Sequence, residues 1–135
     1  MKNIIDDFGK SAGKIWQTLN ENGPLTESKL LKMTRLSEEK FYAAVGWLAR
    51  ENKICKNGSR YQLGDTNLTP KIGTDAGKVW TTLSTNTNID VSSIADLAEI
   101  DERDAYSALG WLARENKIQV TKVGSKNWLH KFAIK

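Results

Sequence analysis

Few side chains in this sequence have the type and spacing that catalysis or metal binding requires. His130 is the only histidine, and no cysteine or acidic residue stands at ligand spacing from it. Cys55 is the only cysteine and falls in a predicted strand, where we interpret it as a small buried hydrophobic residue. Paired acids such as Asp6 and Asp7 mark a helix start. We therefore expect no enzyme, no metal site, no cofactor and no small-molecule ligand.

Residues 9–14 (GKSAGK) have a superficial similarity to a phosphate-binding loop. The stretch lacks the spacing of that loop, follows no predicted strand and lies inside a predicted helix. It does not predict nucleotide binding.

Basic residues are the remaining candidates for a functional site, since the net charge is +4. Lysines beside the two predicted hairpins can contact DNA phosphates without reading sequence. The alternative is that these charges are solvated and protect an exposed hairpin edge. Trp128 has the chemistry to stack on a base, although a role in the core is the stronger alternative. The predicted DNA-binding residues, in the hairpins and in two helices, are Lys40, Lys53, Lys56, Arg60, Arg103, Lys117, Lys122 and Lys126.

An internal repeat determines the domain organisation to which these residues belong. The nine residues GWLARENKI occur twice, at 46–54 and 110–118. A shift of 64 positions aligns residues 9–54 with 73–118 without a gap, and 21 of the 46 pairs are identical. Two copies are too few for a solenoid. We predict two small domains of one type, at 1–64 and 72–135, joined by a linker at 65–71.

Each copy shows the same order of elements. Apolar residues at helical spacing, including Trp16 and Trp80, predict a first helix over about 4–21 and from about 72 onward. A short second helix carries Met33 and Leu97 on its apolar stripe, and a longer third helix spans about 37–52 and 101–116. The sequence then predicts hairpins, with strands at 54–56 and 60–63 in the first copy and at 118–121 and 127–129 in the second.

This order of helix, helix-turn-helix and hairpin predicts an α+β, helix-rich fold of tandem winged helix-turn-helix domains, each with three helices and a β-hairpin wing. The repeated GWLARENKI resembles the motif of a small, largely uncharacterised prokaryotic winged helix-turn-helix family, and the resemblance covers nearly the whole chain. It implies the fold. It says little about function, because winged helix proteins bind DNA or other proteins.

The third helix of each copy lacks the chemistry of a typical DNA-recognition helix. A groove-reading helix meets base edges with its N-terminal residues, yet these helices begin with SEEK and DERD, whose acids repel phosphate. Further along, both copies carry an arc of identical residues opposite the core face. The arc is either an interface, between the copies or between chains, or a surface on which each tryptophan folds onto its own hairpin. Its predicted interface residues are Tyr42, Gly46, Trp47, Arg50, Tyr106, Gly110, Trp111 and Arg114.

Two functions follow from the sequence. The first is a cytoplasmic DNA-binding protein, with transcription regulation as one such role, that contacts the phosphates of double-stranded DNA through its basic wings. The alternative is a module that binds a protein partner or forms a homodimer through the third-helix arc, without DNA. A single cysteine suits a reducing cytoplasm, and no apolar run is long enough to predict a membrane span.

Overall fold

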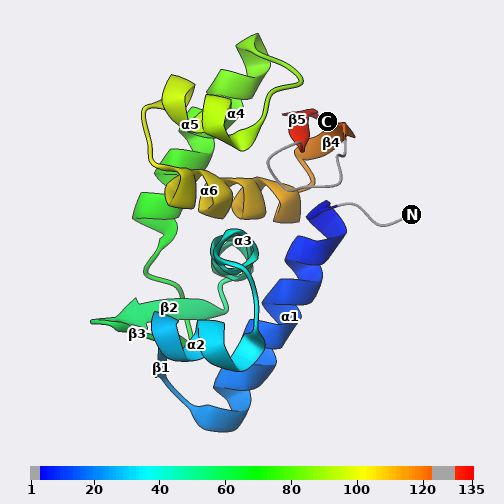
Figure 1. The fold of residues 1–135 in the computed structure, drawn as a ribbon. Helices are drawn as coiled ribbons and strands as arrows, with labels where there is room; N and C mark the ends of the chain where they lie inside the picture. Colours follow the sequence, from blue (N-terminus) through cyan, green and yellow to red (C-terminus); the bar gives the residue numbers. More distant parts are fainter. Residues whose placement is uncertain (1–3, 123–129) are drawn as a thin grey trace.

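A computed structural model describes residues 4–122 and 130–135. The first repeat contains α1 (Ile4–Asn22), β1 (Leu25–Thr26), α2 (Glu27–Thr34), α3 (Glu38–Arg50), β2 (Ile54–Asn57) and β3 (Arg60–Leu63). The second contains the π-helix η1 (Thr69–Gly73), α4 (Thr74–Thr85), α5 (Val91–Ala98), α6 (Glu102–Arg114), β4 (Ile118–Lys122) and β5 (Lys131–Ile134). The tandem winged helix architecture predicted from the sequence is confirmed (Figure 1). None of the described helices is long and apolar enough to cross a bilayer.

Helix boundaries follow capping residues that recur 64 positions apart. Ser37 and Asp101 cap α3 and α6, and each accepts a hydrogen bond from the backbone N–H three residues later. Thr26 and Asp90 do the same for α2 and α5. Such side chains satisfy backbone donors that have no partner within the helix. The backbone just beyond α3 and α6 turns left-handed at an asparagine, with φ of 60° at both Asn52 and Asn116.

The first wing matches the sequence prediction. β2 pairs antiparallel with β3 from Ile54↔Leu63 to Asn57↔Arg60, and β1 adds a third strand in the order β1-β3-β2. Gly58, in the two-residue loop, has a φ of +63°, a conformation that favours glycine. The segment 65–71 predicted as a linker lies against this wing, because Asn67 bonds both the N–H and the C=O of Lys56. η1 begins within that segment, at Thr69.

The prediction for the second wing is wrong in its last strand. We expected that strand at 127–129, whereas β4 pairs with β5 at Lys131–Ile134, with Ile118 opposite Ile134. The reason is burial, because Phe132 is fully buried. Its backbone N–H also donates to the carbonyl of Ile89, which stands where β1 stands in the first repeat. Residues 123–129, including the predicted Lys126 and Trp128, lie outside the described residues.

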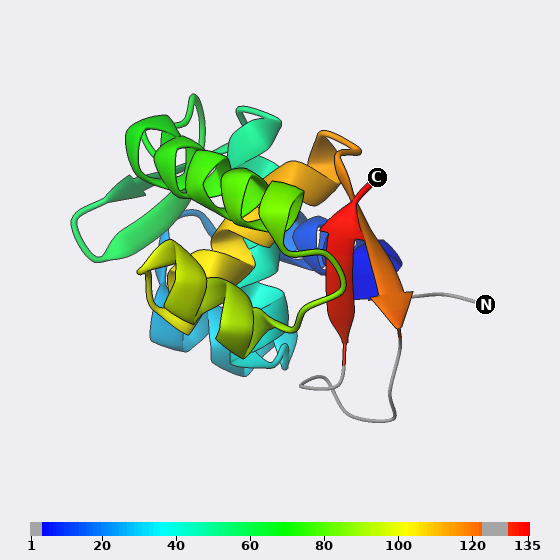
Figure 2. The ribbon, with the colours of Figure 1, turned by 90° about the horizontal axis from the view of Figure 1, so that it is seen from above.

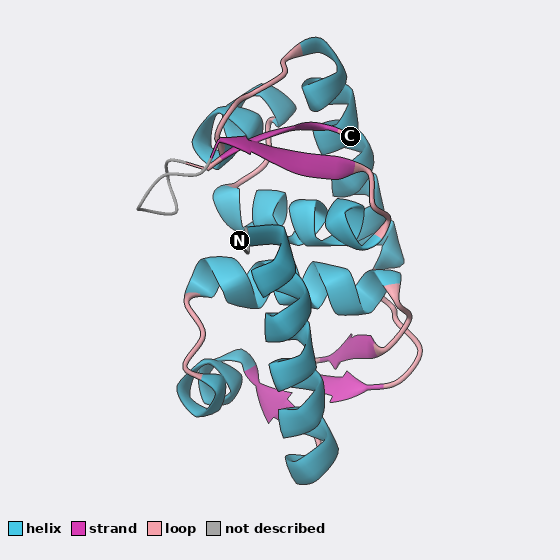
Figure 3. Ribbon diagram, turned by 90° about the vertical axis from the view of Figure 1, so that its right-hand side faces the viewer, coloured by secondary structure: helices cyan, strands magenta, loops and turns pink. Residues whose placement is uncertain are grey.

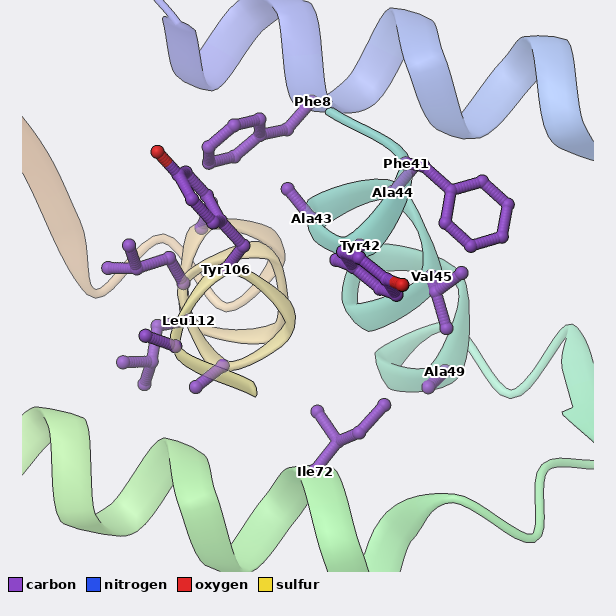
Figure 4. Packing of buried hydrophobic residues seen from close by; sticks show 14 of the residues in the cluster. Phe8, Phe41, Tyr42, Ala43, Ala44, Val45, Ala49, Ile72, Tyr106 and Leu112 are labelled. Atoms are coloured by element: carbon purple, nitrogen blue, oxygen red, sulfur yellow. The ribbon is translucent and has the colours of Figure 1, made fainter. Parts of the chain in front are cut away.

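The two repeats share one hydrophobic core, with α3 and α6 at its centre (Figure 1). Phe8 from α1 and Ile72 from η1, again 64 positions apart, approach this helix pair from opposite sides (Figure 4). The two wings lie on opposite sides of the helices (Figures 2 and 3). The molecule therefore has an approximate two-fold relation between its halves, with the third helices facing each other.

Candidate functional site

The backbones of α3 and α6 approach each other closely at Gly46 and Gly110. A Cβ atom added to Gly46 would lie 1.8 Å from the carbonyl oxygen of Ser107, and one added to Gly110 would lie 1.8 Å from the carbonyl oxygen of Ala43. The Ser107 hydroxyl also donates to the backbone carbonyl of Tyr42 at 3.1 Å. Only glycine lets the two backbones come this close. The third-helix arc is thus a contact between the two copies within one chain.

Ionic and aromatic pairs join the C-terminal ends of the same helices. Nε of Arg50 lies 3.0 Å from a carboxylate oxygen of Glu115, and Nε of Arg114 lies 2.9 Å from one of Glu51. The guanidinium of each arginine also lies over a tryptophan of the other repeat, Arg50 at 5.8 Å from the Trp111 ring centre and Arg114 at 5.9 Å from that of Trp47. These pairs hold the C-terminal ends of α3 and α6 next to each other.

The N-terminal ends of α3 and α6 also lie together, and they are acidic. Glu38, Glu39, Glu102 and Arg103 line a shallow depression over Tyr42 and Tyr106. In a helix-turn-helix domain this end of the recognition helix meets the bases. Here the following turns are buried in the other repeat, with Tyr42 and Tyr106 each 9% exposed. Neither helix presents a free face that could enter a major groove.

Burial also controls the ionisation of the tyrosines in this region. It raises the pKa of Tyr106 to about 12. Burial, followed by the hydrogen bond from the Tyr42 hydroxyl to Glu27 at 2.7 Å, raises the pKa of Tyr42 as well. Both phenols are therefore neutral at physiological pH, and the contact between the repeats carries no tyrosinate charge.

The predicted DNA-binding residues of the third helices lie at both ends of these helices. Lys40 and Arg103 lie at the N-terminal ends of α3 and α6, whereas Lys53 and Lys117 follow the C-terminal ends. A helix of 13 residues separates these two groups by roughly 20 Å. These four cations therefore form no compact cluster.

Most of these cations have partners within the protein. Lys40 lies 3.8 Å from Asp7, Lys53 lies 3.7 Å from Glu51, and Lys117 lies 3.5 Å from Glu115. Such exposed pairs are weak and can exchange for phosphate. In the first wing, Lys56 lies over the Tyr61 ring and Arg60 is exposed. Lys122 belongs to β4.

A pair of equivalent grooves was not recognised from the sequence. Trp16 and Trp80 were expected on the apolar stripes of α1 and α4, but they are 40% and 42% exposed. Each forms one wall of a groove, of about 260 Å³ in the first repeat and 320 Å³ in the second. The first groove is lined by Gly9, Ala12, Gly13, Trp16, Trp47, Leu48, Glu51 and Lys53, and the second by the residues 64 positions later. All eight positions carry the same residue in both repeats, a signal that the sequence does contain.

The single cysteine and the single histidine join no metal-binding cluster in the part of the chain that the structure describes. Cys55 is half-buried in β2, and His130 is buried near the start of β5. Residues 4–122 and 130–135 contain no group of three histidine, cysteine or acidic residues that could hold a metal ion.

The fold defines this chain as a protein of two tandem winged helix-turn-helix domains. A family model described as Winged helix-turn-helix domain (DUF2582) matches it twice, over residues 1–63 and 66–131, and the chain belongs to this family. The family resemblance predicted from the repeated motif is thus confirmed. No curated protein and no solved structure gives a significant match.

Proposed function

We propose that the protein is a non-enzymatic DNA-binding protein that holds duplex DNA by its phosphates and reads no bases with α3 or α6. DNA binding is supported by the winged helix family of the chain, and the absence of base reading by one observation: the faces that would enter the major groove are buried against each other at Gly46 and Gly110. Binding then depends on exposed cations, such as Lys56 and Arg60 in the first wing. We assign the protein to the cytoplasm because its single cysteine suits a reducing compartment.

Binding to duplexes of random sequence, measured from about 50 to 200 mM salt, tests this proposal. Each phosphate contact contributes a slope of about −0.9 in the logarithm of affinity against the logarithm of salt. The variant Lys56→Ala/Arg60→Ala is expected to flatten the slope by about 1.8, and Lys122→Ala/Lys126→Ala to flatten it as well.

A matched control removes two exposed lysines outside the wings, Lys29 and Lys32 on α2. It changes the net charge by the same amount as the wing variants and should leave the slope nearly unchanged. An equal loss in control and wing variants would mean that only net charge matters. No duplex binding at the lowest salt would refute the proposal.

The second candidate is a protein-interaction or scaffolding module. It is favoured by two apolar side chains at equivalent positions, Met33 on α2 and Leu97 on α5, which are 46% and 54% exposed. Exposed apolar residues at matching places on two copies fit a partner that contacts both. This candidate predicts no salt-dependent DNA binding, so the same titration separates the two functions.

A further inference from the structure

The two grooves stand out because they are more alike than the repeats that form them. Across the aligned repeats 21 of 46 pairs are identical, whereas all eight pairs that line the grooves are. Positions near the N-terminal ends of α3 and α6 differ more between the repeats. Lys40 corresponds to Asp104, and Arg35 corresponds to Glu99. Comparison of the two repeats therefore shows that the groove linings are kept more fully than the aligned sequence as a whole.

Packing explains only some of these identities. Gly9 makes room for the Trp47 ring, since an added Cβ would lie 3.2 Å from a ring atom, whereas a Cβ added to Gly73 would lie in ordinary van der Waals contact with the Trp111 ring at 3.6 Å. Gly13 and Gly77 are different, because a Cβ added to either would meet nothing within 4 Å. Glycine within a helix lowers its stability relative to alanine. Packing within the fold does not explain a glycine at position 13 or 77. Close approach of a ligand to the helix backbone does explain it.

The exposed tryptophans point to the kind of ligand. Trp16 and Trp80 keep about two-fifths of their surface in contact with water, although each stands beside a second indole, Trp47 or Trp111. Indole rings at the surface of a groove are platforms on which planar rings stack.

The charges around each groove select an anion. In the first repeat Lys53 lies on the rim, Lys14 follows Gly13 on the exposed side of α1, and Arg114 lies over Trp47. Glu51 is the one carboxylate in the groove lining, and it already pairs with Arg114 and Lys53. The second repeat has the same set from Lys78, Lys117, Arg50 and Glu115. Within each lining the one lysine balances the one carboxylate, so the positive surplus at each groove comes from the further lysine and the arginine beside it.

We propose that each groove binds an unpaired nucleobase of single-stranded DNA or RNA, stacked on its tryptophans, with the adjoining phosphates held by the lysines and the arginine. Aromatic platforms bordered by cations are how proteins hold single strands without sequence preference. A duplex does not fit, because its bases are already stacked on one another. An acidic peptide with aromatic side chains is the competing occupant, and nucleic acid is favoured because every nucleotide carries both a planar ring and a negative charge. The proposal does not require the wing contact.

Tryptophan fluorescence reports directly on the grooves, since four of the five tryptophans line them. Titration with an eight-nucleotide oligothymidylate is expected to quench the emission and to saturate at two strands per chain. Oligouridylate of the same length should behave alike, because the ring and the phosphate are shared. Affinity should fall with salt at a slope of about −0.7 per phosphate contact.

The decisive variant is Gly13→Leu/Gly77→Leu, which fills both grooves with side chains that the open space accepts and that favour the helix. We expect the single variant Gly13→Leu to bind one strand per chain and the double variant to bind none. The matched control is Ser28→Leu/Ser92→Leu, an exposed and equivalent pair on α2 and α5, which should still bind two. Duplex binding should survive in the double variant if the wings hold duplex DNA, which separates failure of this inference from failure of the proposed function.

Either of two results would overturn the assignment. Unchanged binding of oligothymidylate by the double groove variant would place the single strand elsewhere. Quenching by an acidic aromatic peptide, but by neither oligonucleotide, would make the grooves protein-docking sites.

Discussion

Replacing Gly46 by alanine is expected to lower the free energy of unfolding by roughly 3 kcal/mol, at the upper end of the cost of overpacking a core. The new Cβ would lie 1.8 Å from the carbonyl oxygen of Ser107, a backbone atom that cannot swing aside. α3 and α6 must therefore move apart and loosen the core between the repeats. Gly110→Ala should cost about as much, because its Cβ meets the carbonyl of Ala43 in the same way. Urea unfolding followed by circular dichroism measures both.

The double variant Gly46→Ala/Gly110→Ala is expected to lose less than the sum of the single losses. Once one methyl group has separated the helices, the second finds part of its space already made, so the two sites are coupled. The matched control is Gly13→Ala, a helical glycine beside open space, which should gain up to about 1 kcal/mol. If Gly46→Ala were as stable as the natural protein, the helices could not be in this contact.

Replacing Phe132 by alanine is expected to cost about 3–5 kcal/mol, the usual loss for a buried phenylalanine. Phe132 is fully buried, lies opposite Val120 in the second wing and bonds through its backbone to Ile89. Its removal would leave a cavity beneath β5. Thermal or urea unfolding measures the loss.

Leu97→Ala is the control for this experiment, because Leu97 is 54% exposed and its truncation should change stability by less than about 0.5 kcal/mol. A small loss for Phe132→Ala would contradict the burial of β5 in the core.

Local chemistry made most of the fold predictable. Capping side chains such as Ser37 and Asp101 act through bonds to a backbone only three residues away, so they can be read without knowing the tertiary structure. The loop at Gly58 is local in the same sense. The last strand was missed because its position depends on the burial of Phe132 and on its pairing with Ile89, contacts between residues far apart in the chain.

The sites were harder to predict because surface and burial are decided by packing between the repeats. Trp16 fits the apolar stripe of α1, yet periodicity does not tell how wide the buried face is, and Trp16 lies at its edge. Lys40 and Lys53 are close in sequence but lie at opposite ends of α3. The sequence indicated a close contact at Gly46, because a glycine there lies beside a tyrosine and a tryptophan on one face of the predicted helix. Whether it joined two copies or two chains required the structure.

We expect duplex DNA to contact the wings while α3 and α6 read no bases. This expectation is tested most directly by backbone amide chemical shifts in ¹⁵N-labelled protein titrated with a random-sequence duplex at low salt. We expect shifts in β2 and β3, around Lys56 and Arg60, and none at residues 42–46 or 106–110. Shifts concentrated in those two helical segments, with no shifts in the first wing, would contradict this expectation. The contact between α3 and α6 would then have opened to admit DNA.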